Sequence, residues 1–187
     1  MTAVSPLWIL THMIRMIVFL GNPGKDYTAT RHNAGFMLCD YLYPDASYQM
    51  KFHSQFMKAV NVYVMKPMTF MNLSGTAVSE AASFYHMAPE EILVVHDDLE
   101  LPIGKARLQK GGGLQGHNGL RSIKERLGSS DFFRLRIGIG RPEHGDVRLY
   151  VTAPFRKDEM IVMDQLFTRL RDILEAPDKP AEVDING

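Results

Sequence analysis

The residue pair with the clearest chemical potential in this chain is His32 and Asp97. Histidine is the side chain most often used as a general base near neutral pH. A carboxylate that accepts from its other ring nitrogen fixes the tautomer and stabilises the imidazolium. No serine or cysteine motif accompanies the pair, so we expect His32 to activate water. On spacing alone, a capping or surface role competes, and His96 and His117 are alternatives.

Three asparagines form the second candidate set, because each follows a strand or loop and precedes a turn or helix: Asn22, Asn72 and Asn118. A side-chain amide offers two donors and an acceptor without charge. It can therefore bind a peptide group, hold a water or stabilise an oxyanion. For any one of them, turn and capping chemistry is the simpler explanation. Their combination with a His/Asp pair favours a site.

The other motifs argue against common alternatives. Residues 111–116 fit the spacing G-x-G-x-x-G between a strand and a helix, which is typical of dinucleotide binding. The unit does not follow the first strand, and Asp131, the acidic residue at the expected distance, precedes a strand instead of ending it. Neither G-x-x-x-x-G-K-[ST] nor H-E-x-x-H occurs, and the acidic residues and histidines lack metal-site spacing. We expect no metal and no cofactor.

Basic residues are concentrated around the glycine-rich loop, although Lys plus Arg and Asp plus Glu both number 21. A solvated surface explains most of them, but the local excess favours binding to a phosphate backbone. The concentrated residues are Lys105, Arg107, Lys110, Arg121, Lys124, Arg126, Arg134 and Arg136.

Hydrophobic periodicity and turn residues predict alternating strands and helices. The expected strands cover residues 16–20, 60–67, 92–95, 105–110 and 132–139, and the expected helices cover 30–43, 72–86, 119–127 and 157–175. Such alternation is typical of a three-layer α/β domain with a central, twisted, mixed and mostly parallel sheet. In such sheets the site lies beyond the carboxyl ends of the strands, where His96-Asp97 and Met71-Asn72 are expected.

Composition favours one soluble globular domain, since the chain has 187 residues, 45% of them apolar and 22% charged. We expect a single catalytic domain over residues 15–175, a disordered extension or mis-assigned start over 1–14, and a frayed tail over 176–187. No apolar run approaches a membrane span. Cys39 is the lone cysteine. It excludes an intramolecular disulfide, is expected to be a buried hydrophobe, and favours a cytoplasmic location.

Several long motifs resemble bacterial peptidyl-tRNA hydrolase, in order, from about residue 16 to about residue 155. The first runs from Gly21-Asn22-Pro23-Gly24 through Tyr27 to His32-Asn33-Ala34-Gly35, and the second from Pro67 through Met71-Asn72 to Gly75. His96-Asp97-Asp98-Leu99, the loop from Gly111 to Leu120, and the run from Arg134 to Pro142 match the remaining blocks.

The resemblance implies hydrolysis of the ester that joins a peptide to tRNA, by a monomer without metal, cofactor or membrane. It implies that His32 is the base, that Asp97 is its partner and that Asn22 holds the ester and the water. Asn72 and Asn118 would bind the peptide backbone. The substrate would also contact Met71 near the terminal adenosine, Tyr27 near the nucleotide end, and His117.

The tRNA phosphates are expected at Arg107, Lys110 and Arg136. Gln109 stands where the family pattern has a basic residue for the terminal phosphate, and Gln115 where it has glycine. The segment from Asp146 to Phe155 resembles the family's lid only loosely. We also expect the uncharged amides to prefer an N-blocked peptide, because a free ammonium would be poorly solvated among them.

Two other functions compete with this interpretation. The first is a non-catalytic RNA-binding protein on the same fold, against which the intact His32, Asp97 and Asn22 argue. The second is an esterase or peptidase acting on small substrates, against which the basic surface argues.

Overall fold

The computed structural model describes residues 13–175 and 182–184 of the chain. The expectations for residues 1–12, 176–181 and 185–187 lie outside the described residues. Ile14, expected in the N-terminal extension, is 4% exposed and packs into the core. Glu182–Asp184, expected in the tail, is a short strand, β8, beside β6.

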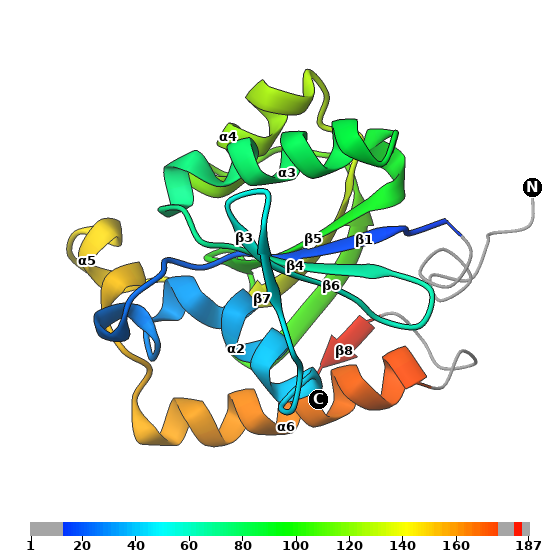
Figure 1. Cartoon of the computed structure of the whole chain (residues 1–187). Helices are drawn as coiled ribbons and strands as arrows, with labels where there is room; N and C mark the ends of the chain where they lie inside the picture. The colour runs from blue at the N-terminus through cyan, green and yellow to red at the C-terminus, as the bar shows by residue number, and fades with distance from the viewer. Residues whose placement is uncertain (1–12, 176–181, 185–187) are drawn as a thin grey trace, which may run out of the picture.

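One mixed sheet forms the centre of the molecule (Figure 1). Among the described residues its order is β2-β3-β4-β1-β5-β7-β6-β8. The four neighbouring strands β4, β1, β5 and β7 are parallel, and the strands on either side are antiparallel. This confirms the predicted sheet with a mostly parallel core. The bounds are β1 (Met16–Phe19), β2 (Gln49–Lys51), β3 (Ser54–Lys58), β4 (Tyr63–Pro67), β5 (Ile92–Asp98), β6 (Lys105–Lys110) and β7 (Phe133–Gly138).

Helices cover both faces of the sheet, so the molecule has three layers (Figure 1). On one face α3 and α4 pack on Met16 and Val18, and on the other α2 and α6 pack on Phe19. Alternate residues of a strand point to opposite faces, so a continuously apolar β1 supplies both cores. The helices are α2 (Ala34–Leu42), α3 (Ser74–Phe84), α4 (Asn118–Leu127), α5 (Val147–Thr152) and α6 (Lys157–Glu175), with 3-10 turns η1 (Lys25–Tyr27), η2 (Arg31–Asn33), η3 (Met71–Leu73) and η4 (Pro89–Glu91).

Several predicted boundaries were wrong. The helix expected from residue 30 begins as α2 at Ala34, after η2. The strand expected from residue 60 begins at Tyr63, and Val60 is 91% exposed in the preceding turn. Asn72 does not cap α3, because η3 intervenes and Leu73 takes the cap position without a side-chain bond. His96 and Asp97 lie inside β5, not after it.

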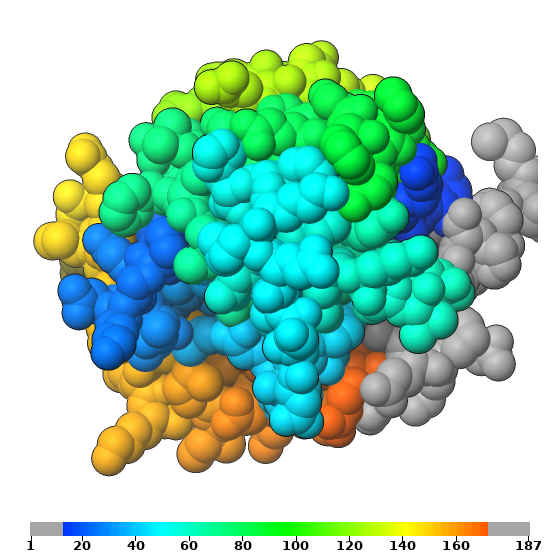
Figure 2. Space-filling model, viewed as in Figure 1, coloured from blue at the N-terminus to red at the C-terminus, as the bar shows by residue number. Residues whose placement is uncertain are grey.

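Two elements had no sequence prediction. The first is the hairpin of β2 and β3, which stands in cyan at the front of the space-filling view (Figure 2). The second is α5, which lies between β7 and α6 in the chain. Neither carries the glycine or periodicity signals on which the other predictions rested.

Gly35 allows α2 to start directly against the sheet. A Cβ at this position would lie 2.5 Å from the carbonyl oxygen of Leu20 and 2.8 Å from that of Val95. Any side chain would therefore push the helix away from β1 and β5. The close approach sets η2, which directly precedes α2 in the chain, beside the carboxyl end of β5.

Candidate active site

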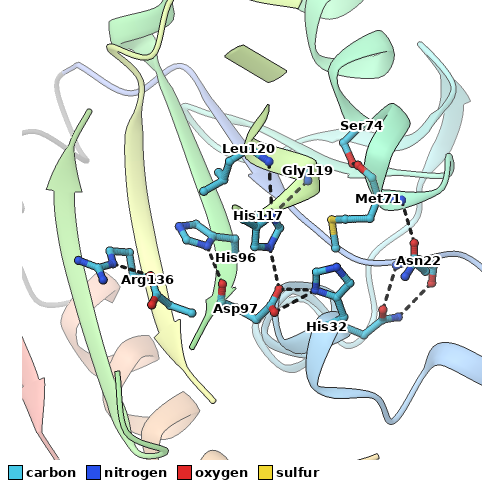
Figure 3. Close-up of polar contacts among 12 residues, drawn as sticks. Asn22, His32, Met71, Ser74, His96, Asp97, His117, Gly119, Leu120 and Arg136 are labelled. Carbon is cyan, nitrogen blue, oxygen red and sulfur yellow. Dashed lines mark hydrogen bonds and ion pairs between the residues drawn. The ribbon is translucent and has the colours of Figure 1, made fainter. Parts of the chain in front are cut away.

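His32 and Asp97 meet at the carboxyl ends of the central strands (Figure 3). His32 lies in η2, ahead of α2, and Asp97 is the next-to-last residue of β5. Nδ1 of His32 is 2.9 Å from each carboxylate oxygen of Asp97. The side chain of Asp97 is 2% exposed and that of His32 is 12% exposed. The buried carboxylate therefore fixes the proton of His32 on Nδ1 and leaves Nε2 as the free, basic nitrogen.

His117 also bonds to Asp97, but its tautomer is the opposite one. Its Nδ1 accepts from the backbone N–H of Gly119 at 3.1 Å and of Leu120 at 3.4 Å, which caps α4. Its proton must therefore be on Nε2, which donates to Asp97 at 2.9 Å. Both ring nitrogens of His117 are therefore committed to hydrogen bonds, so His117 is unsuited to act as a base.

His96 is the third histidine of this cluster and is almost fully buried. Its Nδ1 donates to the backbone carbonyl of Asp97 at 2.7 Å, and this bond restrains the backbone at the carboxyl end of β5. Burial and the neighbouring His117 lower the pKa of His96 to about 3. His96 therefore stays neutral, and its hydrogen bond holds the backbone of Asp97 in place.

The electrostatics of the pair favour a base that works near neutral pH. Burial by itself lowers the pKa of His32. The charge and the hydrogen bond of Asp97 together raise it by more than that, so the pKa of His32 lies above its ordinary value. Burial raises the pKa of Asp97, and the two histidines outweigh that effect and hold it well below its usual range. Asp97 is thus an anion whenever the protein is folded near neutrality.

Asn22 is oriented by two neighbours (Figure 3). The backbone N–H of Met71 donates to its Oδ1 at 2.8 Å, which identifies that atom as the oxygen. The side chain of Asn33 bonds both ways to the backbone of Asn22, at 2.9 and 3.0 Å. Nδ2 of Asn22 keeps no partner within the described part of the chain, and Figure 3 draws His32 between Asn22 and Asp97.

A cavity of about 140 Å³ opens beside the histidines. His32, Asp97, His117 and Asn118 all line it. Asn22 lines a neighbouring hollow of about 290 Å³. The two hollows share no lining residue, and His32 of the first is next in the chain to Asn33 of the second.

The remaining predicted substrate residues lie around this centre with different exposure. Asn72 and Asn118 are exposed, and Oδ1 of Asn118 accepts from Arg121 at 2.9 Å. Met71 is 4% exposed and packs with α3 and α4. Tyr27 is half-buried in an edge-to-face contact with Phe70, whose ring is 6.2 Å away.

The predicted phosphate residues lie on β6 and β7. Arg107 is exposed and opposite Arg136 in the antiparallel register. Nε of Arg136 donates to Asp98 at 2.7 Å, and its Nη1 donates to Oε1 of Gln109 at 2.7 Å. Gln109 thus supports Arg136 where the family pattern has a second cation. Lys110 is exposed and its Nζ lies 5.8 Å from the ring of Phe133.

Arg134 was assigned to the basic surface by its sequence neighbours, which was wrong. Its side chain is among the largest fully buried ones, and its guanidinium donates to the carbonyls of Gly111 and Gly113. It therefore locks the glycine loop that leads to His117. Gln115, in that loop, has a φ of 51°, a left-handed conformation that explains why glycine suits this position.

Arg31, directly before His32, is a further supporting residue of the site that the sequence did not single out. Its guanidinium donates to Glu159 of α6 at 2.7 Å and to the carbonyl of Pro154 at 2.9 Å. The same guanidinium lies 4.3 Å from the ring centroid of Tyr150 in α5. Arg31 therefore ties the turn that carries His32 to α5 and α6. In the sequence, the only signal for Arg31 was its position directly before the predicted base.

His32, Asp97 and His117 could also be read as ligands for a metal, since one donor atom from each lies within 4.8 Å of the others. Their hydrogen bonds favour a different interpretation. Both imidazoles direct an N–H at Asp97, and the remaining nitrogen of His117 is used by α4. This arrangement is suited to proton transfer by His32.

Together, the three-layer fold and a buried carboxylate behind a histidine with one free nitrogen define a hydrolase-type site that activates water. The family model described as Peptidyl-tRNA hydrolase matches residues 16–180. The chain belongs to this family.

Individual relatives agree with the family match. The peptidyl-tRNA hydrolase of Geobacter sp. (strain M21) is 48% identical over 168 residues, which cover 86% of this chain and 89% of that protein. That of Bordetella petrii is 44% identical and covers 90% and 86% of the two chains. The crystal structure of peptidyl-tRNA hydrolase from Acinetobacter baumannii superposes with a TM-score of 0.80 at 38% identity, covering 87% of each chain.

Proposed function

We propose that this protein hydrolyses the ester bond between the peptide and the terminal ribose of peptidyl-tRNA, and so recycles tRNA from stalled or aborted translation. The observation that carries this function is the His32–Asp97 pair, with a free Nε2 at a cavity, in a chain of the peptidyl-tRNA hydrolase family. The rival, an RNA-binding protein without activity, has no need of this buried pair.

In the proposed reaction His32 removes a proton from water through Nε2, and the hydroxide attacks the ester carbonyl. The positive charge that develops on the ring is stabilised by Asp97, 2.9 Å from Nδ1. His32 then returns the proton to the leaving ribose oxygen. His96 and His117 hold Asp97 in place through their hydrogen bonds.

Asn22 is proposed to bind the ester carbonyl and the attacking water. Its Oδ1 is occupied by Met71 N–H, so its uncommitted Nδ2 is available as a donor. A fixed neutral donor stabilises negative charge that develops on the carbonyl oxygen. Asn33 holds the backbone of Asn22 and so keeps this donor aimed.

The amides also account for the proposed preference for an N-blocked peptide. Asn72 and Asn118 are exposed at the rim and are proposed to bind the peptide backbone. A free α-ammonium would find no anionic partner among these neutral amides. Tyr27 and Met71 are proposed to contact the nucleotide end, together with His117.

The tRNA backbone is proposed to contact the cations of β6 and β7, namely Arg107, Lys110 and Arg136. Arg136 is supported by Asp98 and Gln109, so its guanidinium is pre-oriented. Arg107 and Lys110 are exposed. Phosphate contacts of this kind position the substrate and carry no sequence information.

We further propose that the enzyme is monomeric, cytoplasmic and independent of metal. Among the described residues, no helix combines the length and apolar character needed to cross a bilayer. Sedimentation of the purified protein tests the monomer. Hydrolysis that persists unchanged in excess chelator tests the independence from metal, and loss of activity restored by a divalent ion would contradict it.

The function is tested by incubating the protein with N-acetyl-aminoacyl-tRNA and with the free aminoacyl-tRNA. We expect release of tRNA from the acetylated substrate at a rate at least about tenfold higher, because unpaired polar groups cost about 1–3 kcal/mol. Binding of tRNA without cleavage would favour the RNA-binding alternative. Equal rates would contradict the proposed role of the amides.

A further inference from the structure

Helix α5 presents one side to the cavity that His32 and Asp97 line. Val147, Arg148 and Val151 line this cavity, and Val151 shares one helix face with both of the others, four residues after Val147 and three after Arg148. Leu149 is 71% exposed and belongs to the other side. The arginine is therefore on the cavity side of the helix.

Arg148 is the cation of this cavity that has no acidic partner. Asp97 accepts hydrogen bonds from His32 and His117, and Asp98 is paired with Arg136 at 2.7 Å. In the described part of the chain, no carboxylate lies within ion-pair distance of the Arg148 guanidinium, and Asp146 accepts from its backbone N–H instead. The unpaired guanidinium therefore places an uncompensated positive charge at the α5 end of the cavity.

The helix that carries Arg148 is held in place by the body of the protein. The hydroxyl of Tyr150 donates to the carbonyl of Ile139 at 2.7 Å. The backbone N–H of Arg31 donates to the carbonyl of Ala153 at 3.1 Å, at the end of the helix. Because Arg31 precedes His32 directly, these bonds fix the position of Arg148 relative to the proposed base.

We propose that Arg148 binds the phosphodiester that precedes the terminal nucleoside of the substrate. This inference rests on the proposed function. The ester to be cut lies on the terminal ribose, so the nearest fixed negative charge of the substrate is that phosphodiester. A guanidinium offers a planar pair of donors that fits two phosphate oxygens. The contact would be made from α5, separately from the cations of β6 and β7.

Two small substrates isolate this contact. One is an N-acetyl-aminoacyl ester of adenosine, which has no phosphate, and the other is the same ester of a dinucleotide with one phosphodiester. Arg148→Gln is expected to lower kcat/KM for the dinucleotide ester and for N-acetyl-aminoacyl-tRNA about tenfold, mainly through KM, since a hydrogen bond to a charged group contributes about 1.5–3 kcal/mol. Hydrolysis of the adenosine ester is expected to be unchanged.

Two further variants separate this role from a general loss of charge or structure. Arg148→Lys keeps the charge and is expected to restore part of the lost affinity. Lys58→Gln removes an exposed cation on β3, outside the basic set around the glycine-rich loop, and is expected to leave all three substrates unaffected. Both readouts depend on the phosphate and not on folding.

The inference is overturned if Arg148→Gln hydrolyses the dinucleotide ester like the wild type, or if it loses the same factor on the adenosine ester. Either result leaves the proposed function standing, because the wild type still cleaves N-acetyl-aminoacyl-tRNA. Failure of the wild type to cleave that substrate would remove the proposed function and this inference with it.

Discussion

At the scale of single residues, three histidines bond to Asp97, two at its carboxylate and one at its backbone carbonyl, and yet they have different roles. The hydrogen-bond partner of each second nitrogen decides which role it takes. In His117 that partner is the start of α4, and in His96 one nitrogen is buried without a partner in the described structure. In His32, whose side chain is 12% exposed beside the cavity, the second nitrogen has no partner in the described part of the chain. Side-chain identity alone did not distinguish them.

Asp97→Asn tests this assignment through the pH dependence of kcat/KM. The unprotonated His32 is the active form, and Asp97 raises its pKa above 6.5, so wild-type activity is expected to fall as the pH drops through a value above 6.5. Without the carboxylate, burial alone lowers that pKa, and the acid limb is expected to move below 6.5. The rate at the optimum should fall at least about 10²-fold. An acid limb in the wild-type position would contradict the role of Asp97.

The sequence predicted the chemistry of these residues better than their support. His32, Asp97 and Asn22 stand out because their types suit a hydrolase and because family motifs carry them. Asn33 and Arg134 do not, since their roles depend on partners 11 and 23 positions away. Such pairings are set by the tertiary fold, which one sequence does not reveal.

At the scale of elements, the hairpin of β2 and β3 shows why a turn can escape prediction. Phe52 and His53 form its two-residue loop with φ values of 53° and 51°. Such turns usually contain Asn-Gly or Asp-Gly, and this sequence has neither. Packing supplies what the turn residues lack, since the ring of Phe52 contacts Phe56 at 5.3 Å, Phe84 at 5.4 Å and Tyr85 at 5.9 Å.

His53→Gly is expected to stabilise the protein by about 0.5–1 kcal/mol in urea denaturation. A left-handed residue with a side chain costs about 1–2 kcal/mol, and glycine loses about 0.5–1 kcal/mol of that gain through chain entropy. The ion pair lost with Glu80 is exposed and contributes little. His53→Val, with a branched side chain, should instead destabilise. If both variants shifted stability in the same direction, the turn would not be strained as described.

The tie between η2 and α6 is the second feature at this scale, and it is tested by Glu159→Ala. The side chains of Arg31 and Glu159, which form this ion pair, are 5% and 6% exposed. Removing one partner leaves a buried charge, which costs about 3–5 kcal/mol. As a control, Glu125→Ala at an exposed position of α4 should change the free energy of unfolding by less than about 0.5 kcal/mol. Equal urea midpoints for the two variants would show that the pair does not hold these elements together.

At the scale of the whole molecule, the sheet order creates the site. Strand β5 lies between β1 and β7 in the parallel core, so its carboxyl end, with Asp97, faces the turn that follows β1. Alternating strands and helices were sufficient to predict this architecture. The hairpin of β2 and β3, strand β8 and helix α5 were missed, because such short elements carry little hydrophobic pattern.

The formal net charge of zero means that any attraction of tRNA must come from local cations. The double variant Arg107→Gln, Lys110→Gln is expected to weaken tRNA binding. It should also make the dependence on log salt concentration shallower by about 1.4–1.8, since each of the two phosphate contacts contributes about 0.7–0.9. Gel-shift titrations at several salt concentrations measure the slope. A weaker affinity with the wild-type slope would place the phosphate contacts on other residues.

The most direct test of the account is single-turnover release of tRNA from N-acetyl-aminoacyl-tRNA by the wild type, by His32→Ala and by the exposed control His144→Ala. His32→Ala is expected to lose at least about 10²-fold in rate while it still binds tRNA, because it lacks the group that takes the proton from water. His144→Ala should match the wild type. A His32→Ala enzyme that releases tRNA at the wild-type rate would contradict the assignment of the base.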